Sequence, residues 1–137
     1  MIVEIFSLCD AATEQHGRLN LLGTFDTIWA DQAPITYPQC AVAIRMRFSK
    51  IEEGEHALKL SVVNADGKPL VNAFETKLNI QFHKTDRTTL TANLILNLHG
   101  LKIETHGEYA IDLAINGRQE ASLPFFVSAR PAQNPHE

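Results

Sequence analysis

The amino-acid sequence predicts an all-β domain, an antiparallel sandwich of two sheets with about seven to nine strands. Three observations carry this prediction. Apolar and polar side chains alternate in about eight segments, glycine-containing turn signals separate these segments, and no segment has the period of an amphipathic helix. Since each alternating strand has one apolar face, a second sheet must cover the first.

The size of the chain favours one domain. Its 137 residues, 45% of them hydrophobic, suffice for a single core, which we expect to span residues 1–129. Residues 130–137 contain two prolines and little apolar material, so we expect a mobile tail there.

Charge and hydropathy narrow the classes of function. A formal net charge of -4 disfavours binding to nucleic acid or to an anionic membrane. No stretch approaches the roughly 20 apolar residues needed to cross a bilayer. Strand-like alternation begins at the first residues, so we expect no signal peptide there. We therefore expect a cytoplasmic protein, in which Cys9 and Cys40 remain thiols of the core.

The first three strands are expected in residues 1–9, 18–30 and 40–48. Gly23 shifts the alternation of the second segment, which predicts a bulge or a strand that changes sheets. In the third, one face is apolar and the other carries Ala41, Ala43, Arg45 and Arg47. Only the apolar face is expected to be buried, so Val42→Asp should destabilise the fold severely and Ala43→Asp mildly.

The rest of the chain predicts two hairpins and one further strand. Residues 57–74 alternate on either side of Asp66-Gly67, for which we expect positive φ angles, and a strand is expected over residues 73–82. Another strand is expected over residues 88–98. The last hairpin turns at Asn116-Gly117, which suits a type I′ turn. Pro124 in its second strand cannot donate a ladder hydrogen bond, so its nitrogen should face an unpaired edge or a bulge.

The closing segment GEYAIDLAINGRQEASLPFFV is typical of the last two strands of an immunoglobulin-like sandwich, with Tyr109 shortly after Gly107. The cysteine–tryptophan–cysteine order of antibody domains is missing, because Trp29 precedes Cys40 and no later cysteine follows. The segments EIFSLCD, GRLNLLGTFDTIWA and VAIRMRF resemble a family of small uncharacterised bacterial proteins. That resemblance implies an immunoglobulin-like sandwich without an established activity or catalytic motif.

No spacing of residues in the sequence indicates catalysis, a cofactor or a metal site. The six histidines and two cysteines lack zinc-ligand spacing, and there is no nucleophile elbow, phosphate-binding loop or dinucleotide fingerprint. Cys9 has His16 nearby in the sequence, but a core role is the simpler interpretation. We therefore predict no catalytic, cofactor-binding or metal-binding residues, and an enzyme is not the expected class.

Four residues are candidates for protein contact: Trp29, Arg45, Arg47 and Phe126. Tryptophan and arginine are frequent at interaction hot spots. The alternative for the two arginines is a surface ion pair with a carboxylate on the next strand, and for Trp29 a cap on the core.

The leading hypothesis is a non-enzymatic module that acts through protein contacts, with a second copy or another protein as partner. We expect the final strand to be a sheet edge, with Phe125 inward and Phe126 outward, so that Phe126 could join a homodimer or rest under the tail. The alternative is a small-ligand binding protein or cryptic enzyme. Its site would gather His16, His99 and His106 with carboxylates at one end of the sandwich.

Overall fold

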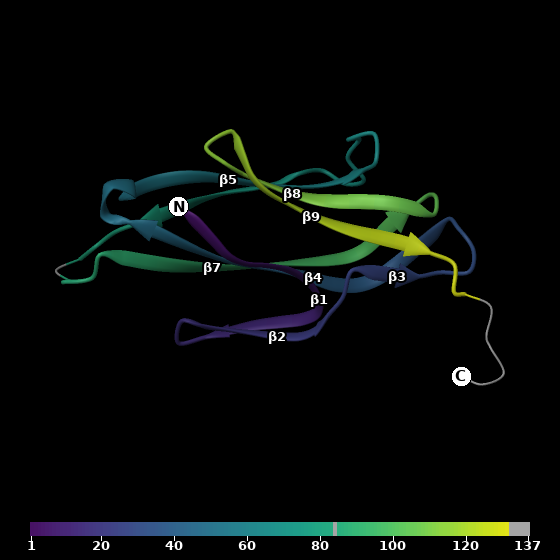
Figure 1. The fold of residues 1–137 in the computed structure, drawn as a ribbon, viewed down its shortest axis with the longest axis horizontal. Helices are drawn as coiled ribbons and strands as arrows, with labels where there is room; N and C mark the ends of the chain where they lie inside the picture. The colour runs from purple at the N-terminus through teal and green to yellow at the C-terminus, as the bar shows by residue number, and fades with distance from the viewer. Residues whose placement is uncertain (84, 132–137) are drawn as a thin grey trace.

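The computed structural model describes residues 1–83 and 85–131, which form nine strands in two sheets (Figure 1). The elements are β1 (Ile2–Gln15), β2 (Arg18–Thr24), β3 (Thr27–Trp29), β4 (Ile35–Ser49), the 3-10 helix η1 (Lys50–Glu52), β5 (Gly54–Asn64), β6 (Phe74–Ile80), β7 (Thr89–Ile103), β8 (Gly107–Ile115) and β9 (Arg118–Ser128). One sheet has the order β2-β1-β4-β7 and the other β3-β9-β8-β5-β6. The prediction of an all-β protein with two sheets is confirmed. Within the described residues, no helix has the length and apolar character needed to span a bilayer.

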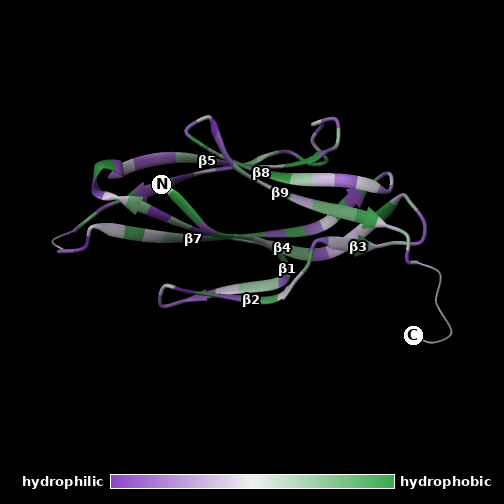
Figure 2. Cartoon of the chain, viewed as in Figure 1, coloured by the Kyte–Doolittle hydropathy of each residue, from purple (hydrophilic) through white to green (hydrophobic). Residues whose placement is uncertain are grey.

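The core lies between the two sheets and is built from their alternating faces. Figure 2 shows hydrophobic and hydrophilic residues alternating along the strands. The predicted apolar face of β4 is fully buried: Cys40, Val42, Ile44, Met46 and Phe48 are at most 1% exposed. Strands β5, β8 and β9 contribute the opposite half of the core, with Leu58, Leu60, Ile111, Leu113, Phe125 and Val127.

The two predicted hairpin turns differ in how closely they match expectation. Asn116 and Gly117 have φ angles of 53° and 81°, which confirms the type I′ turn between β8 and β9. After β5, only Gly67 has a positive φ, so the expectation for Asp66 was wrong. The reason is that the turn is a three-residue loop, in which the backbone N–H of Asn64 donates to the carbonyl oxygen of Lys68. Loops of this type need the left-handed conformation only at their last residue, which here is Gly67.

Gly23 lies just before the point where the chain passes from one sheet to the other. The segment 18–30 is not one strand: β2 ends at Thr24 in the four-stranded sheet and β3 begins at Thr27 in the five-stranded sheet. Gly23 has a φ of 67°, and a Cβ at this position would overlap the carboxylate of Asp10 on the paired strand. The predicted change of sheet is therefore confirmed.

The distal part of β1 and all of β2 form a hairpin that folds back under the four-stranded sheet (Figure 1). We call residues 10–24 the β1–β2 arm. Strand β1 pairs with β4 as far as Cys9 and with β2 from Cys9 onward. Leu19 and Leu21 of the arm pack over Ala41 and Ala43 on the outer face of β4.

This arm overturns the expectation that only one face of β4 is buried. Ala43 is 0% exposed, like Val42 on the opposite face. A carboxylate at either position would therefore lose its hydration, so the premise of the mild effect expected for Ala43→Asp, an exposed outer face of β4, is wrong. Alternation along β4 could not reveal the arm, because the residues that cover Ala43 come from another part of the chain.

The final strand, β9, was expected to be a sheet edge, but part of it is covered by β3. Strand β3 pairs in parallel with the end of β9, and the N–H of Phe126 donates to the carbonyl oxygen of Asp26. Pro124 lies two residues earlier, so its nitrogen faces the same side, beyond the start of β3. The predicted position of Pro124 at an unpaired part of the edge is confirmed.

Candidate functional site

Two candidate contact residues lie on adjacent strands and on one face. Ile28 and Val127 point into the core, so their neighbours Trp29 and Phe126 point outward from the five-stranded sheet. Trp29 is 52% exposed and Phe126 is 37% exposed. The predicted outward direction of Phe126 is confirmed. We call Trp29, Phe126 and the exposed Pro124 the aromatic surface.

Arg45 and Arg47 lie on the other sheet and form hydrogen bonds within the molecule. Glu4 on β1 receives hydrogen bonds from both guanidinium groups, at 3.1 Å from Nε of Arg45 and 2.7 Å from Nε of Arg47. Arg45 also donates from Nη1 to the carbonyl oxygen of Gly17 at the tip of the β1–β2 arm, 3.3 Å away. Asn93 on β7 donates to the same oxygen at 3.1 Å. Arg45 and Asn93 thus hold the tip of the arm against the sheet.

The charges in this network stabilise one another. The hydrogen bond from Arg47, with a smaller contribution from Arg45, lowers the pKa of Glu4, and Glu4 raises the pKa of Arg47. The four residues predicted for protein contact therefore divide into two pairs on opposite sheets. Whether the tail covers Phe126 concerns residues 132–137, which lie outside the described part of the chain.

The three histidines proposed for a ligand site do not converge. His16 lies at the tip of the arm, beside Gly17, whose carbonyl oxygen accepts from Arg45. His99 lies opposite Gln39, six residues from Arg45 along β4, on the order of 20 Å for an extended strand. His106 lies in the turn before β8, and its Nε2 is 2.6 Å from the backbone carbonyl oxygen that follows β3. The expected gathering of these side chains at one end is wrong.

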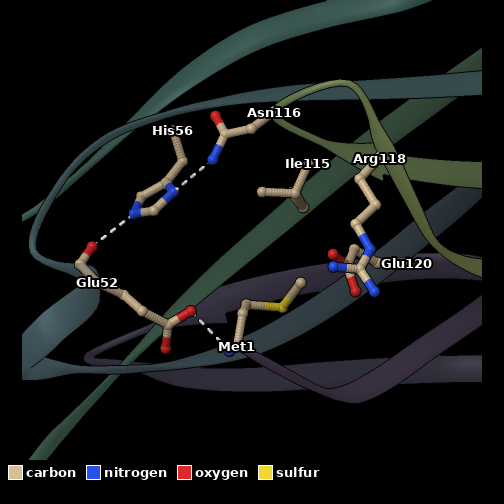
Figure 3. A pocket seen from close by; sticks show the side chains of 7 residues that line it. All are labelled: Met1, Glu52, His56, Ile115, Asn116, Arg118 and Glu120. Atoms are coloured by element: carbon tan, nitrogen blue, oxygen red, sulfur yellow. Dashed lines mark hydrogen bonds and ion pairs between the residues drawn. The ribbon is translucent and has the colours of Figure 1, made fainter.

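A pocket does exist at the end of the sandwich near η1, with a volume of about 470 Å³ (Figure 3). It is lined by Met1, Glu52, His56, Ile115, Asn116, Arg118 and Glu120. Nε2 of His56 lies 2.5 Å from the carbonyl oxygen of Glu52, and Nδ1 lies 3.0 Å from Nδ2 of Asn116. The carbonyl can only accept and the amide Nδ2 can only donate, so in this network Nε2 of His56 donates and Nδ1 accepts.

The carboxylate of Glu52 is the most strongly shifted acid at this end. The amino group of Met1 lies 2.6 Å from Oε2, and the backbone N–H and hydroxyl of Ser49 donate to Oε1. These donors, the amino group first, lower the pKa of Glu52 to about 2. Sequence reasoning missed this cluster, although Ser49-Lys50-Ile51-Glu52 has the spacing of a capping box, in which serine and glutamate exchange hydrogen bonds.

The two cysteines are buried thiols on opposite faces of the four-stranded sheet, as members of different apolar clusters. Burial is the main cause that raises the pKa of Cys9 and raises that of Cys40 to about 11. Thiols with raised pKa values carry little thiolate at neutral pH, so neither is an activated nucleophile. Within the described residues, no group of three histidine, cysteine or acidic side chains is arranged to hold a metal ion.

Comparisons with known proteins place the chain in a family and find structural neighbours. Its fold is similar to part of the alkylpurine DNA glycosylase AlkC of Pseudomonas fluorescens, solved with DNA containing an abasic site analog. The TM-score is 0.50 at 10% identity, and the match covers 76% of this chain and 28% of the glycosylase chain, which is a likeness of fold alone. No curated protein matches the chain. The model of the family of unknown function DUF6941 matches residues 4–128, so the chain belongs to that family.

Proposed function

We propose that the domain is a non-enzymatic interaction module that binds another protein through the aromatic surface. The observation that carries this proposal is the exposure of Trp29 and Phe126 on adjacent strands and on one face. Both residues sit on paired strands, so little backbone entropy is lost when they bind. Tryptophan is among the residues that most often dominate binding energy, and aromatic side chains are enriched at interfaces.

The chemistry of the aromatic surface indicates what a partner must offer. Covering one large apolar side chain contributes on the order of 1.5–3 kcal/mol before the costs of association are subtracted. Glu108 on β8 lies directly opposite Phe126, on the same face, and is exposed. A partner with an apolar pocket beside a basic group would match both features.

We also propose that the fold is immunoglobulin-like, in a bacterial cytoplasmic protein. The order β1-β4-β7 matches the A-B-E part of one immunoglobulin sheet, and β9-β8-β5 matches G-F-C of the other. Where the chain crosses from β7 to β8, the hydroxyl of Tyr109 donates to the carbonyl oxygen of Thr105 at 2.5 Å, which is the hydrogen bond of a tyrosine corner. The two buried thiols suit a reducing compartment.

The test compares what three forms of the immobilised protein retain from a lysate of the native host. These forms are the wild type, Trp29→Ser combined with Phe126→Ser, and Ile51→Ser. Ile51 is 94% exposed in η1, at the end of the sandwich away from β3 (Figure 1), so its variant controls for loss of any exposed apolar side chain.

A protein retained by the wild type and by Ile51→Ser, but lost by the double variant, supports the proposal once purified components reproduce that difference. Identical sets from all three forms would contradict it. Sedimentation of Phe126→Ser covers the case in which the partner is a second copy: a wild-type dimer that this substitution dissociates would place self-association at the aromatic surface.

A second candidate function is the binding of a small ligand in the pocket near η1. The observation that favours it is the combination of an imidazole, a guanidinium and two carboxylates around one hollow (Figure 3). We would screen small charged molecules by the melting temperature of the wild type and of Arg118→Ala. A compound that stabilises the wild type and loses its effect in the variant would favour this function, whereas equal shifts in both would count against it.

A further inference from the structure

The four edges of the two sheets differ sharply in how well they are protected against pairing with another strand. An exposed edge presents unpaired N–H and C=O groups, and proteins usually blunt it with short strands, charges, proline or bulges. Three edges in the described part of the chain have such features. Strand β2 is short and contains Gly23 with a positive φ, and β6 is short and exposes Glu75 and Lys77. The three-residue β3 pairs only with the end of β9, and Pro124 lies in the part of β9 before this pairing.

Strand β7 lacks these features from Thr89 to His99, and its one glycine with a positive φ, Gly100, lies near its C-terminal end. It has 15 residues and runs along almost the whole length of the molecule (Figure 1), pairing with β4 from end to end. From Thr88 to Leu101 the sequence has no aspartate, glutamate, lysine, arginine or proline. Within residues 1–83 and 85–131, the backbone of β7 forms hydrogen bonds with no element other than β4.

The side chains beside this edge are also incompletely covered. Leu94 and Leu96 of β7 face the core but are only half-buried, whereas the residues opposite them on β4 are fully buried. Leu78 of β6, at the corresponding edge of the other sheet, is half-buried as well. An open row of backbone groups therefore lies beside a partly exposed row of apolar side chains.

We infer that β7 is the contact through which two copies of this chain associate, by antiparallel pairing of β7 with β7 of the second copy. A second copy fits because identical antiparallel strands satisfy two-fold symmetry without any further adaptation. A pairing centred near Ile95 sets the uncharged stretches of both strands opposite each other and keeps the two copies of Lys102 at opposite ends of the contact. The two four-stranded sheets then become one continuous sheet.

This dimer is independent of the proposed aromatic surface, which belongs to the other sheet. Phe126→Ser should therefore leave it intact, so the two proposals can fail separately. If Phe126→Ser dissociates the dimer and a change in β7 does not, the second copy binds at the aromatic surface and the inference about β7 is wrong.

The experiment uses Leu96→Lys on β7 and Leu78→Lys on β6. In a monomer, the aliphatic part of either lysine can pack on the core while its amine reaches solvent between the edge strands β6 and β7. In the dimer, the amine at position 96 would be enclosed by the second copy, so only Leu96→Lys should dissociate it. Sedimentation at micromolar concentrations measures the oligomeric state, and circular dichroism checks that both variants are folded.

Hydrogen exchange on the unmodified chain provides the measurement that depends on no variant. Alternate amides of β7 should exchange more slowly as the protein concentration rises, while those of β6 should not change. A dimeric wild type, a monomeric Leu96→Lys and a dimeric Leu78→Lys support the inference. A wild type that stays monomeric, a dimer that survives Leu96→Lys, or exchange in β7 that ignores concentration would overturn it.

Discussion

At the scale of single residues, Gly23 has two reasons to be glycine. Its φ of 67° is unfavourable for other residues, and a side chain there meets Asp10. Gly17 also has a positive φ, of 77°, but lies in open space. We expect Gly17→Ala to cost about 1–2 kcal/mol of stability through backbone strain alone. Gly23→Ala should cost clearly more, as measured by urea unfolding, and equal costs would show that Asp10 moves aside freely.

The substitutions at Val42 and Ala43 test both buried faces of β4. We expect Val42→Asp and Ala43→Asp each to destabilise the protein by on the order of 4 kcal/mol or more, because each buries an unpaired carboxylate. Gln39→Asp, on an exposed position of the same strand, is the control and should change stability little. Urea midpoints measure all three, and a mild effect of Ala43→Asp would mean that the arm does not stay closed.

At the scale of elements, the β1–β2 arm depends on a contact that only one of the two arginines makes. Both Arg45 and Arg47 bind Glu4, but only Arg45 reaches the carbonyl oxygen of Gly17 at the tip of the arm. We expect Arg45→Ala to increase proteolytic cleavage and amide exchange within residues 10–24, and Arg47→Ala to leave them nearly unchanged. Similar effects of both variants would mean that Glu4, rather than the tip contact, holds the arm.

The individual strands and turns were easier to predict from the sequence than the contacts between them. Alternation located most of the strands, although it merged β2 and β3 into one segment. Asn116-Gly117 identified its turn, and both signals work because they depend on adjacent residues. The burial of Ala43, the pairing of β3 with β9 and the separation of His16 from His99 depend on contacts between distant segments. The end pocket was missed for the same reason, since Met1, Glu52 and Asn116 come from three different parts of the chain.

At the scale of the whole molecule, Glu52 makes stability depend on pH. Its pKa is lowered from 4.5 to about 2 in the folded protein, so its contribution is fully present above about pH 4.5 and is lost as the pH falls toward 2. We expect Glu52→Gln to flatten the fall in unfolding free energy between pH 4.5 and 2, as measured by urea unfolding at several pH values. An unchanged slope would show that Glu52 keeps its partners in the unfolded chain.

The parallel pairing of β3 with β9 has a consequence for how the protein is made. Trp29 pairs with Ser128, so a strand that leaves the ribosome early has to wait for a partner about 100 residues later. Strand β1, by contrast, meets β4 soon after synthesis. The five-stranded sheet can therefore be completed only when translation of the domain is nearly finished, and until then Ile28 lacks the strand beside which it is buried.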